Sequence, residues 1–215
     1  MTKRNKLLVT ILCLACVLCA LVSGTIAWLI SQPGSITNTF TSSDVTITLT
    51  ETKGTLTDGV RGFKMVPGEV IAKDPVVAVE AGSEACYVFV KIDENLGSWS
   101  TYAVAGKNFK SFLNYTVDTA EGWTALEGYA GVYYIKVDAN IANEGKSYNV
   151  LAGNVVTVSG ENVTKAMMET LEASDANLPT LTFTASAIQV ANLPDKNGDT
   201  TVDAVDAWLI LNGNN

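Results

Sequence analysis

Oxygen-bearing side chains recur with a regular spacing near the C-terminal end of the chain. They occupy positions 1, 3, 5, 7, 9 and 12 of a twelve-residue loop: Asp195, Asn197, Asp199, Thr201, Asp203 and Asp206. A hard divalent cation such as calcium takes six or more oxygen ligands, and a loop that wraps once before a helix presents alternate side chains inward. The spacing is that of an EF-hand loop, with an aliphatic residue at position 8. These six residues are the candidate calcium ligands.

A second interpretation of the same loop stays open. Its terminal aspartate makes the loop similar to the calcium loops of dockerins, although position 6, where the sharp turn prefers glycine, is Thr200, and the chain has one such loop where dockerins have two. The alternative is an acidic turn before a helix. In that case Asp203 and Asp206 lie in the first helical turn, where they face the positive end of the helix dipole.

The composition argues against an enzyme. The chain has no histidine, which excludes serine triads, histidine-based acid–base pairs and HExxH zinc sites. The acidic residues are scattered over predicted turns, and no apolar motif frames two of them as a pair for glycoside chemistry. We therefore expect a protein without catalytic residues.

The first 27 residues have the three-part layout of a secretory signal peptide. Basic residues come first, then 16 uncharged residues from 7 to 22, then a small-residue segment that ends at Ala27. The apolar run is shorter than the roughly 20 residues that a membrane-spanning helix needs. We expect cleavage between Ala27 and Trp28, a secreted protein of the extracellular matrix or cell surface, and membrane contact only through the uncleaved leader.

Removal of this leader leaves 188 residues and changes the net charge from −8 to −11, because the leader holds three basic residues and no acidic one. Such a charge argues against binding to nucleic acid or to anionic lipid. Of the four cysteines only Cys86 remains, so no intramolecular disulfide is expected. Alternation puts Cys86 on one strand face with Val88 and Val90, which predicts a small buried hydrophobe.

The rest of the chain has the pattern of a mostly β protein. Short alternating apolar runs, each bounded by turn residues, predict strands at residues 45–50, 76–79, 85–92, 131–137, 155–158 and 181–190. Helical periodicity is confined to residues 163–173 and 204–211. We predict a jelly-roll-like antiparallel β-sandwich with one or two short helices. Its expected parts are a signal peptide at 1–27, an N-terminal segment at 28–41 and one domain at 42–215.

Several short motifs span most of the chain: residues 23–28, 38–41 and 45–51 near the start, 66–69, 73–79 and 86–91 in the middle, and 185–189 with 206–208 near the end. The motifs near the start resemble the TasA/camelysin family, and those in the middle and near the end resemble its clostridial branch, the BsaA-like biofilm matrix proteins. The resemblance implies a jelly-roll subunit that is exported, trimmed by a SipW-type signal peptidase and assembled with identical subunits into extracellular fibres.

Residues 28–41 are predicted to act as a donor strand that completes the sheet of a neighbouring subunit. Cleavage frees an apolar end at Trp28, and residues 35–41 carry no charge, with Ile36 and Phe40 on one face and threonines on the other. The alternative is that the same residues form the first edge strand of their own domain.

The sequence also allows an alternative to a function as a fibre subunit. The chain could be a monomeric adhesin that binds glycan or host protein through exposed aromatic loops, at residues 99–102 or 123–134.

Overall fold

The apolar run of residues 85–90 forms the first half of β6 (Cys86–Asn95), a central strand of the largest sheet. It pairs antiparallel with β12 (Thr180–Gln189) on one side and with β9 (Val132–Val137) on the other, and β9 pairs with β8 (Thr124–Ala125). The first five residues of β6 are all buried. Apolar residues therefore stand on both faces of this strand, because both faces are covered.

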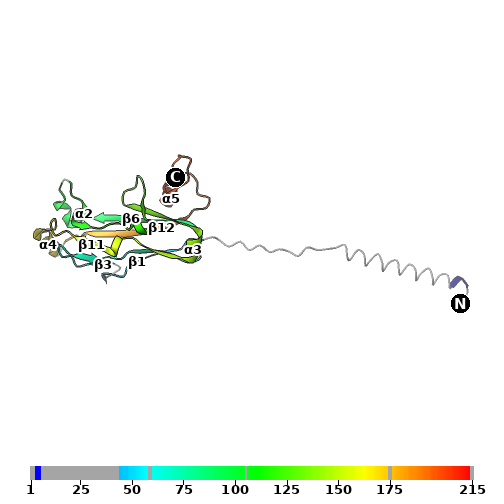
Figure 1. Cartoon of the computed structure of the whole chain (residues 1–215), viewed down its shortest axis with the longest axis horizontal. Coiled ribbons are helices and arrows are strands. Elements are labelled where there is room, and N and C mark those ends of the chain that lie inside the picture. Colours follow the sequence, from blue (N-terminus) through cyan, green and yellow to red (C-terminus); the bar gives the residue numbers. More distant parts are fainter. Residues whose placement is uncertain (1–2, 6–43, 58–59, 105, 174–175, 214–215) are drawn as a thin grey trace. The chain divides into compact units, whose positions relative to one another are not determined.

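Two smaller sheets, each of three antiparallel strands, pack against the same core. One has the order β1 (Ile47–Thr50), β5 (Val76–Val79), β10 (Lys146–Asn149), and the other the order β4 (Val70–Ala72), β11 (Val155–Val158), β7 (Leu113–Asn114). A hairpin of β2 (Thr55–Thr57) and β3 (Val60–Gly62) pairs only within itself among the residues with assigned structure. Figure 1 shows the strands as two layers.

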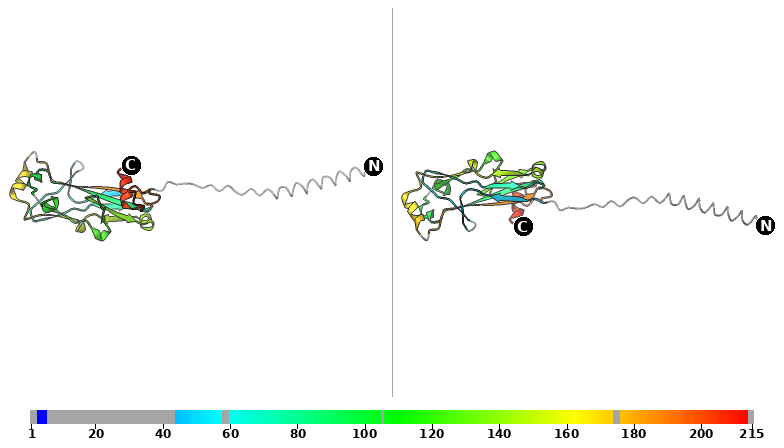
Figure 2. Two further views of the ribbon diagram at one scale, coloured as in Figure 1. Left: turned by 90° about the horizontal axis from the view of Figure 1, so that it is seen from above. Right: turned by 90° about the horizontal axis from the view of Figure 1, so that it is seen from below.

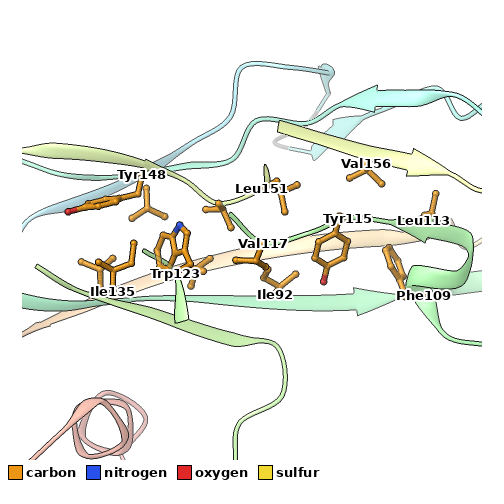
Figure 3. Packing of buried hydrophobic residues seen from close by; sticks show 14 of the residues in the cluster. Ile92, Phe109, Leu113, Tyr115, Val117, Trp123, Ile135, Tyr148, Leu151 and Val156 are labelled. Carbon is orange, nitrogen blue, oxygen red and sulfur yellow. The ribbon is translucent and has the colours of Figure 1, made fainter. Parts of the chain in front are cut away.

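The hydrophobic core fills the space between the layers. In Figure 3, Tyr148, Leu151 and Val156 come from one layer and meet Ile92 and Ile135 from the other. Burial of this apolar area, at roughly 25 cal/mol per Å², is the main force that holds the layers together.

The helical segments are short and lie between or beside the strands. They are η1 (Gly97–Tyr102), α2 (Phe109–Phe112), η2 (Thr119–Glu121), α3 (Ala139–Glu144), η3 (Ala152–Asn154), α4 (Lys165–Glu172) and α5 (Ala204–Leu211). Helix α5 covers the outer face of β6, where its Trp208 ring lies 5.3 Å from the Phe89 ring. Figure 2 shows α5, in red, at the opposite end of the domain from α4, in yellow.

This computed structural model describes residues 3–5, 44–57, 60–104, 106–173 and 176–213. The chain divides into two compact units, residues 1–41 and 42–215, and the fold above is that of the second. The predicted cleavage site at Ala27 and Trp28, and the donor segment with Ile36 and Phe40, lie outside the described residues, as does the predicted signal peptide apart from residues 3–5. No helix within the described ranges is long and apolar enough to cross a membrane.

The prediction of a mostly β, antiparallel protein is confirmed. One or two short helices were predicted, and the described residues of the second unit form four short α-helices and three 3-10 segments. Strands at residues 76–79 and 155–158 and the helix at 204–211 have the predicted bounds, and the other predicted elements differ by one to three residues at their ends. Cys86, Val88 and Val90 are fully buried on one face of β6, as the alternation predicts.

Candidate functional site

The acidic loop before α5 is closed by hydrogen bonds between its side chains and its own backbone. The Asp195 carboxylate accepts from the amides of Gly198 and Thr200, at 2.6 and 2.9 Å. Two further turns close in the same way: Asn197 Oδ1 accepts from the Asp199 amide at 3.0 Å, and Asp199 Oδ1 accepts from the Thr201 amide at 2.8 Å.

The last two candidate ligands form a reciprocal cap at the N-terminus of α5. Asp203 is the N-cap residue, and its Oδ1 accepts from the amides of Val205 and Asp206 at 2.7 and 3.4 Å. Asp206 Oδ2 accepts in return from the Asp203 amide at 3.0 Å. This is the capping box that acidic residues near a helix start are known to form.

Asp206 also anchors the start of the loop. Its side chain is fully buried, and Oδ1 accepts from the amides of Lys196 and Asn197 at 2.6 and 2.9 Å. Burial by itself would raise the pKa of this carboxyl, but hydrogen bonds from the amides of Asp203, Lys196 and Asn197 outweigh it and hold the pKa below its ordinary value. The charged form of Asp206 thus ties both ends of the loop together.

The capped acidic turn is therefore confirmed as the local geometry. The oxygen donors have the hardness that calcium prefers. Over the part of the chain that the structure describes, however, no three acidic, cysteine or histidine side chains lie close enough to hold a metal ion. The loop as it stands turns its carboxylates toward backbone amides, and calcium binding remains a prediction.

The two tryptophans in the aromatic loops at residues 99–102 and 123–134 are buried. Trp99 and Trp123 are buried in the core, and their indole nitrogens donate to the carbonyls of Met167 and Asn149, at 2.9 and 2.8 Å. Both tryptophan rings are therefore core residues and do not belong to an exposed platform. The alternative of an adhesin that binds through these loops stays a prediction.

A groove of about 870 Å³ opens between β1 and β12, which the sequence pattern did not indicate. Its walls come from the end of β1, the β2–β3 hairpin, β4 and the start of β12. Its apolar lining continues the core, since Phe109, Leu113 and Val156 line the groove and also lie at one end of the row of core side chains in Figure 3.

Both strands beside the groove are edges of their sheets. β1 and β12 lie close together without hydrogen-bonded pairing, and among the strands of the described residues neither has a partner on its groove side. β12 is ten residues long and contains no charged residue, glycine or proline. Its inward-facing Leu181 and Phe183 pack on the core but are only partly buried, whereas Val88 and Val90 on the neighbouring β6 are fully buried. The core is therefore incomplete along this edge.

An ion pair, Lys73–Glu51, lies in the mostly apolar lining of the groove, which also includes Arg61 and the threonines 50, 180 and 182. Lys73 Nζ lies 2.9 Å from Glu51 Oε1 and 3.1 Å from Oε2, and it sits over the rings of Phe63 and Phe183, at 4.8 and 5.1 Å from the ring centroids. Lys73 is only 8% exposed. A nearly buried amine of this kind is held by its carboxylate partner and by the two aromatic faces.

The base of the hairpin is fixed beside this pair. The Asp74 carboxylate accepts from the amides of Thr52 and Lys53, at 3.0 and 2.8 Å, and Arg61 donates to the Lys53 carbonyl at 3.2 Å. The hairpin wall of the groove is thus tied to the end of β4.

A scan against protein-family models and searches of curated proteins and of solved structures each found no match. The geometry of the groove and of the acidic loop therefore carries the functional argument.

Proposed function

We propose that this protein is a secreted structural subunit that assembles with identical subunits into extracellular biofilm matrix fibres or pilus-like polymers. The observation that supports this most is the apolar groove beside the start of β12, where no strand of the described residues pairs with the groove-side edge. We further propose that the two layers are of the jelly-roll type, because each layer pairs strands that are distant in sequence, such as β6 with β12.

A long uncharged edge strand favours addition of another strand. Monomeric proteins protect such edges with charges, proline, bulges or covering loops, because unpaired backbone groups template pairing with another chain. β12 has no such protective residue. Six large apolar residues are exposed in the described parts of the chain, and three of them line the groove: Leu49, Leu56 and Leu178. Exposed apolar area is thus concentrated where a strand would dock.

The proposed occupant is the segment 28–41 of a second copy of the chain. Residues 35–41 are uncharged, and in an extended strand Ile36 and Phe40 face the same side. Strand addition joins backbone hydrogen bonds along an edge with side chains in pockets, and this segment supplies both.

Donation by a neighbour is favoured over insertion of the chain's own segment. The groove lies at the Leu49–Glu51 end of β1. At the other end, the chain continues past β5, where the Asp44 carbonyl accepts from the Glu84 amide at 3.1 Å. In extended backbone, Asp44 is about 23 Å from Glu51. The segment before residue 44 therefore joins the domain at the end of β1 that faces away from the groove, and it would have to reverse its direction to fill the groove of its own domain.

Polymerisation of the chain that begins at Trp28 tests this proposal. We expect filaments by negative-stain microscopy and a rise in light scattering, and we expect neither from a chain that begins at residue 42. A matched pair of variants separates the two faces of the segment: Ile36→Ser/Phe40→Ser should block assembly, and Thr37→Ser/Thr39→Ser should leave it intact. Filaments from the truncated chain at the parent rate would overturn the proposal.

Export and processing complete the proposal. A SipW-type signal peptidase would release the segment by cleavage after Ala27, and until then the leader would hold the chain at the membrane, so that assembly is restricted to the outside of the cell. No residue is proposed to act in catalysis.

We also propose that the acidic loop binds calcium, with Asp195, Asn197, Asp199, Thr201, Asp203 and Asp206 as its ligands. The regular spacing of six oxygen donors supports this. Binding would require several carboxylates to leave the backbone amides that they now accept from.

A further inference from the structure

The Lys73–Glu51 pair poses a problem for any strand that fills the groove. The pair lines the groove, and its side chains retain only 10% and 17% of their exposure. A docked strand would remove the remaining water. Covering a charged pair is costly unless its spare hydrogen-bonding positions find new partners. This inference rests on the proposed function, since it concerns the strand that docks there.

The pair has such spare positions. A lysine amine has three donors and a carboxylate accepts at about four sites. The described contacts of this pair use the amine and the carboxylate mainly for each other. An incoming group that both accepts and donates would satisfy both partners, whereas an aliphatic side chain would satisfy neither.

The groove alternates in polarity around the pair. Ile71, Lys73 and Pro75 all line it, and they are alternate residues of one chain segment. Alternate residues of extended backbone are about 7 Å apart. The groove wall therefore has the order apolar, polar, apolar at steps of about 7 Å.

The proposed donor segment has the same order at the same spacing. Its inward residues would be Ile36, Asn38 and Phe40, since alternate residues of a strand share a face. Asn38 is thus the single polar residue between two apolar ones. Its amide group carries a carbonyl oxygen that accepts and an NH₂ that donates.

We infer that the Lys73–Glu51 pair recognises Asn38 of the donated strand and thereby sets its register. The Asn38 carbonyl oxygen accepts from Lys73 Nζ, and the Asn38 NH₂ donates to the Glu51 carboxylate. Ile36 and Phe40 then occupy the apolar positions on either side. A slip by two residues would place Ile36 or Phe40 against the ion pair, which the pair disfavours. A charged residue at position 38 would repel one member of the pair.

Peptide binding tests this inference without assembly. The acceptor is the chain lacking residues 1–41, which keeps the whole compact unit and its core. The probe is a fluorescently labelled peptide of residues 32–43, and binding is measured by anisotropy. We expect the Asn38→Leu and Asn38→Asp peptides to bind at least about tenfold more weakly, since each leaves nearly buried polar groups unsatisfied or repelled. A Thr37→Val peptide, changed on the opposite face, should bind like the parent.

An acceptor variant supplies the reciprocal test. Lys73→Met/Glu51→Met gives the groove an apolar wall, and this acceptor should prefer the Asn38→Leu peptide over the parent, with its folding checked by thermal unfolding. If the parent peptide binds but the position-38 peptides bind equally well, the inference is wrong and the proposed strand donation stands. If the parent peptide fails to bind and the chain from Trp28 forms no filaments, the proposed function falls and the inference with it.

Discussion

Lys73 and Glu51 form an ion pair with a nitrogen–oxygen distance of 2.9 Å in the wall of a mostly apolar groove. The two residues lie 22 positions apart: Glu51 directly follows β1, and Lys73 directly follows β4. The pair therefore links the two small sheets at the point where the hairpin β2–β3 leaves the domain. The contribution of this pair to the free energy of unfolding can be measured on the folded domain alone, apart from the proposed strand docking.

Replacement of Lys73 by methionine is expected to lower the free energy of unfolding by about 3 kcal/mol, because the Glu51 carboxylate would stay nearly buried without its partner. Methionine keeps most of the apolar stem, so lost packing contributes little. The double variant Lys73→Met/Glu51→Gln should recover most of this loss, since neither side chain is then charged. Urea unfolding of the three proteins measures the difference. Equal losses in the single and double variants would show that the ion pair is not the cause.

The buried carboxylate of Asp206 predicts a pH dependence of stability. Its pKa in the folded protein is lowered, since hydrogen bonds from backbone amides outweigh the opposing effect of burial. The unfolded value is about 3.9. A lowered folded-state pKa gives stabilisation that is present above the unfolded pKa and is lost as the pH falls through the folded one.

The variant Asp206→Asn removes this titration and keeps the shape of the side chain. The difference in Tm between the parent and the variant should therefore be largest near pH 7 and should shrink as the pH falls below about 4. Asp74, whose pKa is also lowered, titrates in both proteins and does not affect the difference. A difference in Tm that stays constant from pH 7 to pH 2.5 would contradict the assignment.

The sequence predicts the strands better than it predicts the groove. Strands such as β5 and β11 are readable because alternation or a short apolar run between turn residues is a local property. The groove forms where β1 meets β12, which are about 130 residues apart. No local pattern shows which two edges will face each other. Lys73 looks like an ordinary surface lysine in the sequence, and only the fold places it between Phe63 and Phe183.

The tryptophans and the acidic loop also show that the sequence predicts local contacts but not contacts between distant residues. Trp99 and Trp123 begin the two loops that were considered as exposed aromatic surfaces, yet each indole nitrogen donates to a backbone carbonyl and each ring is buried. The acidic loop was predicted both as a calcium site and as a helix cap. The cap follows from contacts within three residues and is therefore visible in the sequence. A metal site depends on the convergence of side chains over the whole loop.

Calcium is expected to raise the Tm of the parent protein at millimolar concentration, because a ligand that binds only the folded state stabilises it by mass action. The double variant Asp195→Ala/Asp199→Ala should abolish this rise. Magnesium at the same concentration serves as the control for ionic strength. If calcium leaves the Tm of the parent unchanged, the capped turn is a full account of the loop.

Gly97 should not tolerate a side chain. It has a φ of +54°, and a Cβ atom there would overlap the carbonyl oxygen of Asn177. Gly97→Ala is expected to cost about 3 kcal/mol, of which the left-handed backbone accounts for about 1 and the clash for the rest. Gly82 is a matched control, since its φ is +88° and no atom lies within 4 Å of the added Cβ. Gly82→Ala should therefore cost only about 1 kcal/mol in urea unfolding. Equal costs at the two positions would show that the approach to Asn177 is looser than the structure indicates.

The exposed leucines at the groove give the sharpest test of where subunits would meet in the proposed assembly. Leu56 and Leu178 are 58% and 54% exposed and line the groove, whereas Val104 is 61% exposed and lies outside it. All three side chains face water in the monomer, so their replacement by serine should change the free energy of unfolding by no more than about 0.5 kcal/mol. A strand docked beside β12 would cover the two leucines and leave Val104 exposed. Loss of that burial, at roughly 1.5 kcal/mol for each leucine, should slow or weaken assembly about tenfold in Leu56→Ser and in Leu178→Ser.

The control variant Val104→Ser should assemble at the parent rate. Light scattering of the chain from Trp28 at several concentrations measures the effect, and thermal unfolding confirms that each variant is folded. Impaired assembly in Val104→Ser, with normal assembly in both leucine variants, would place the contact between subunits elsewhere on the surface.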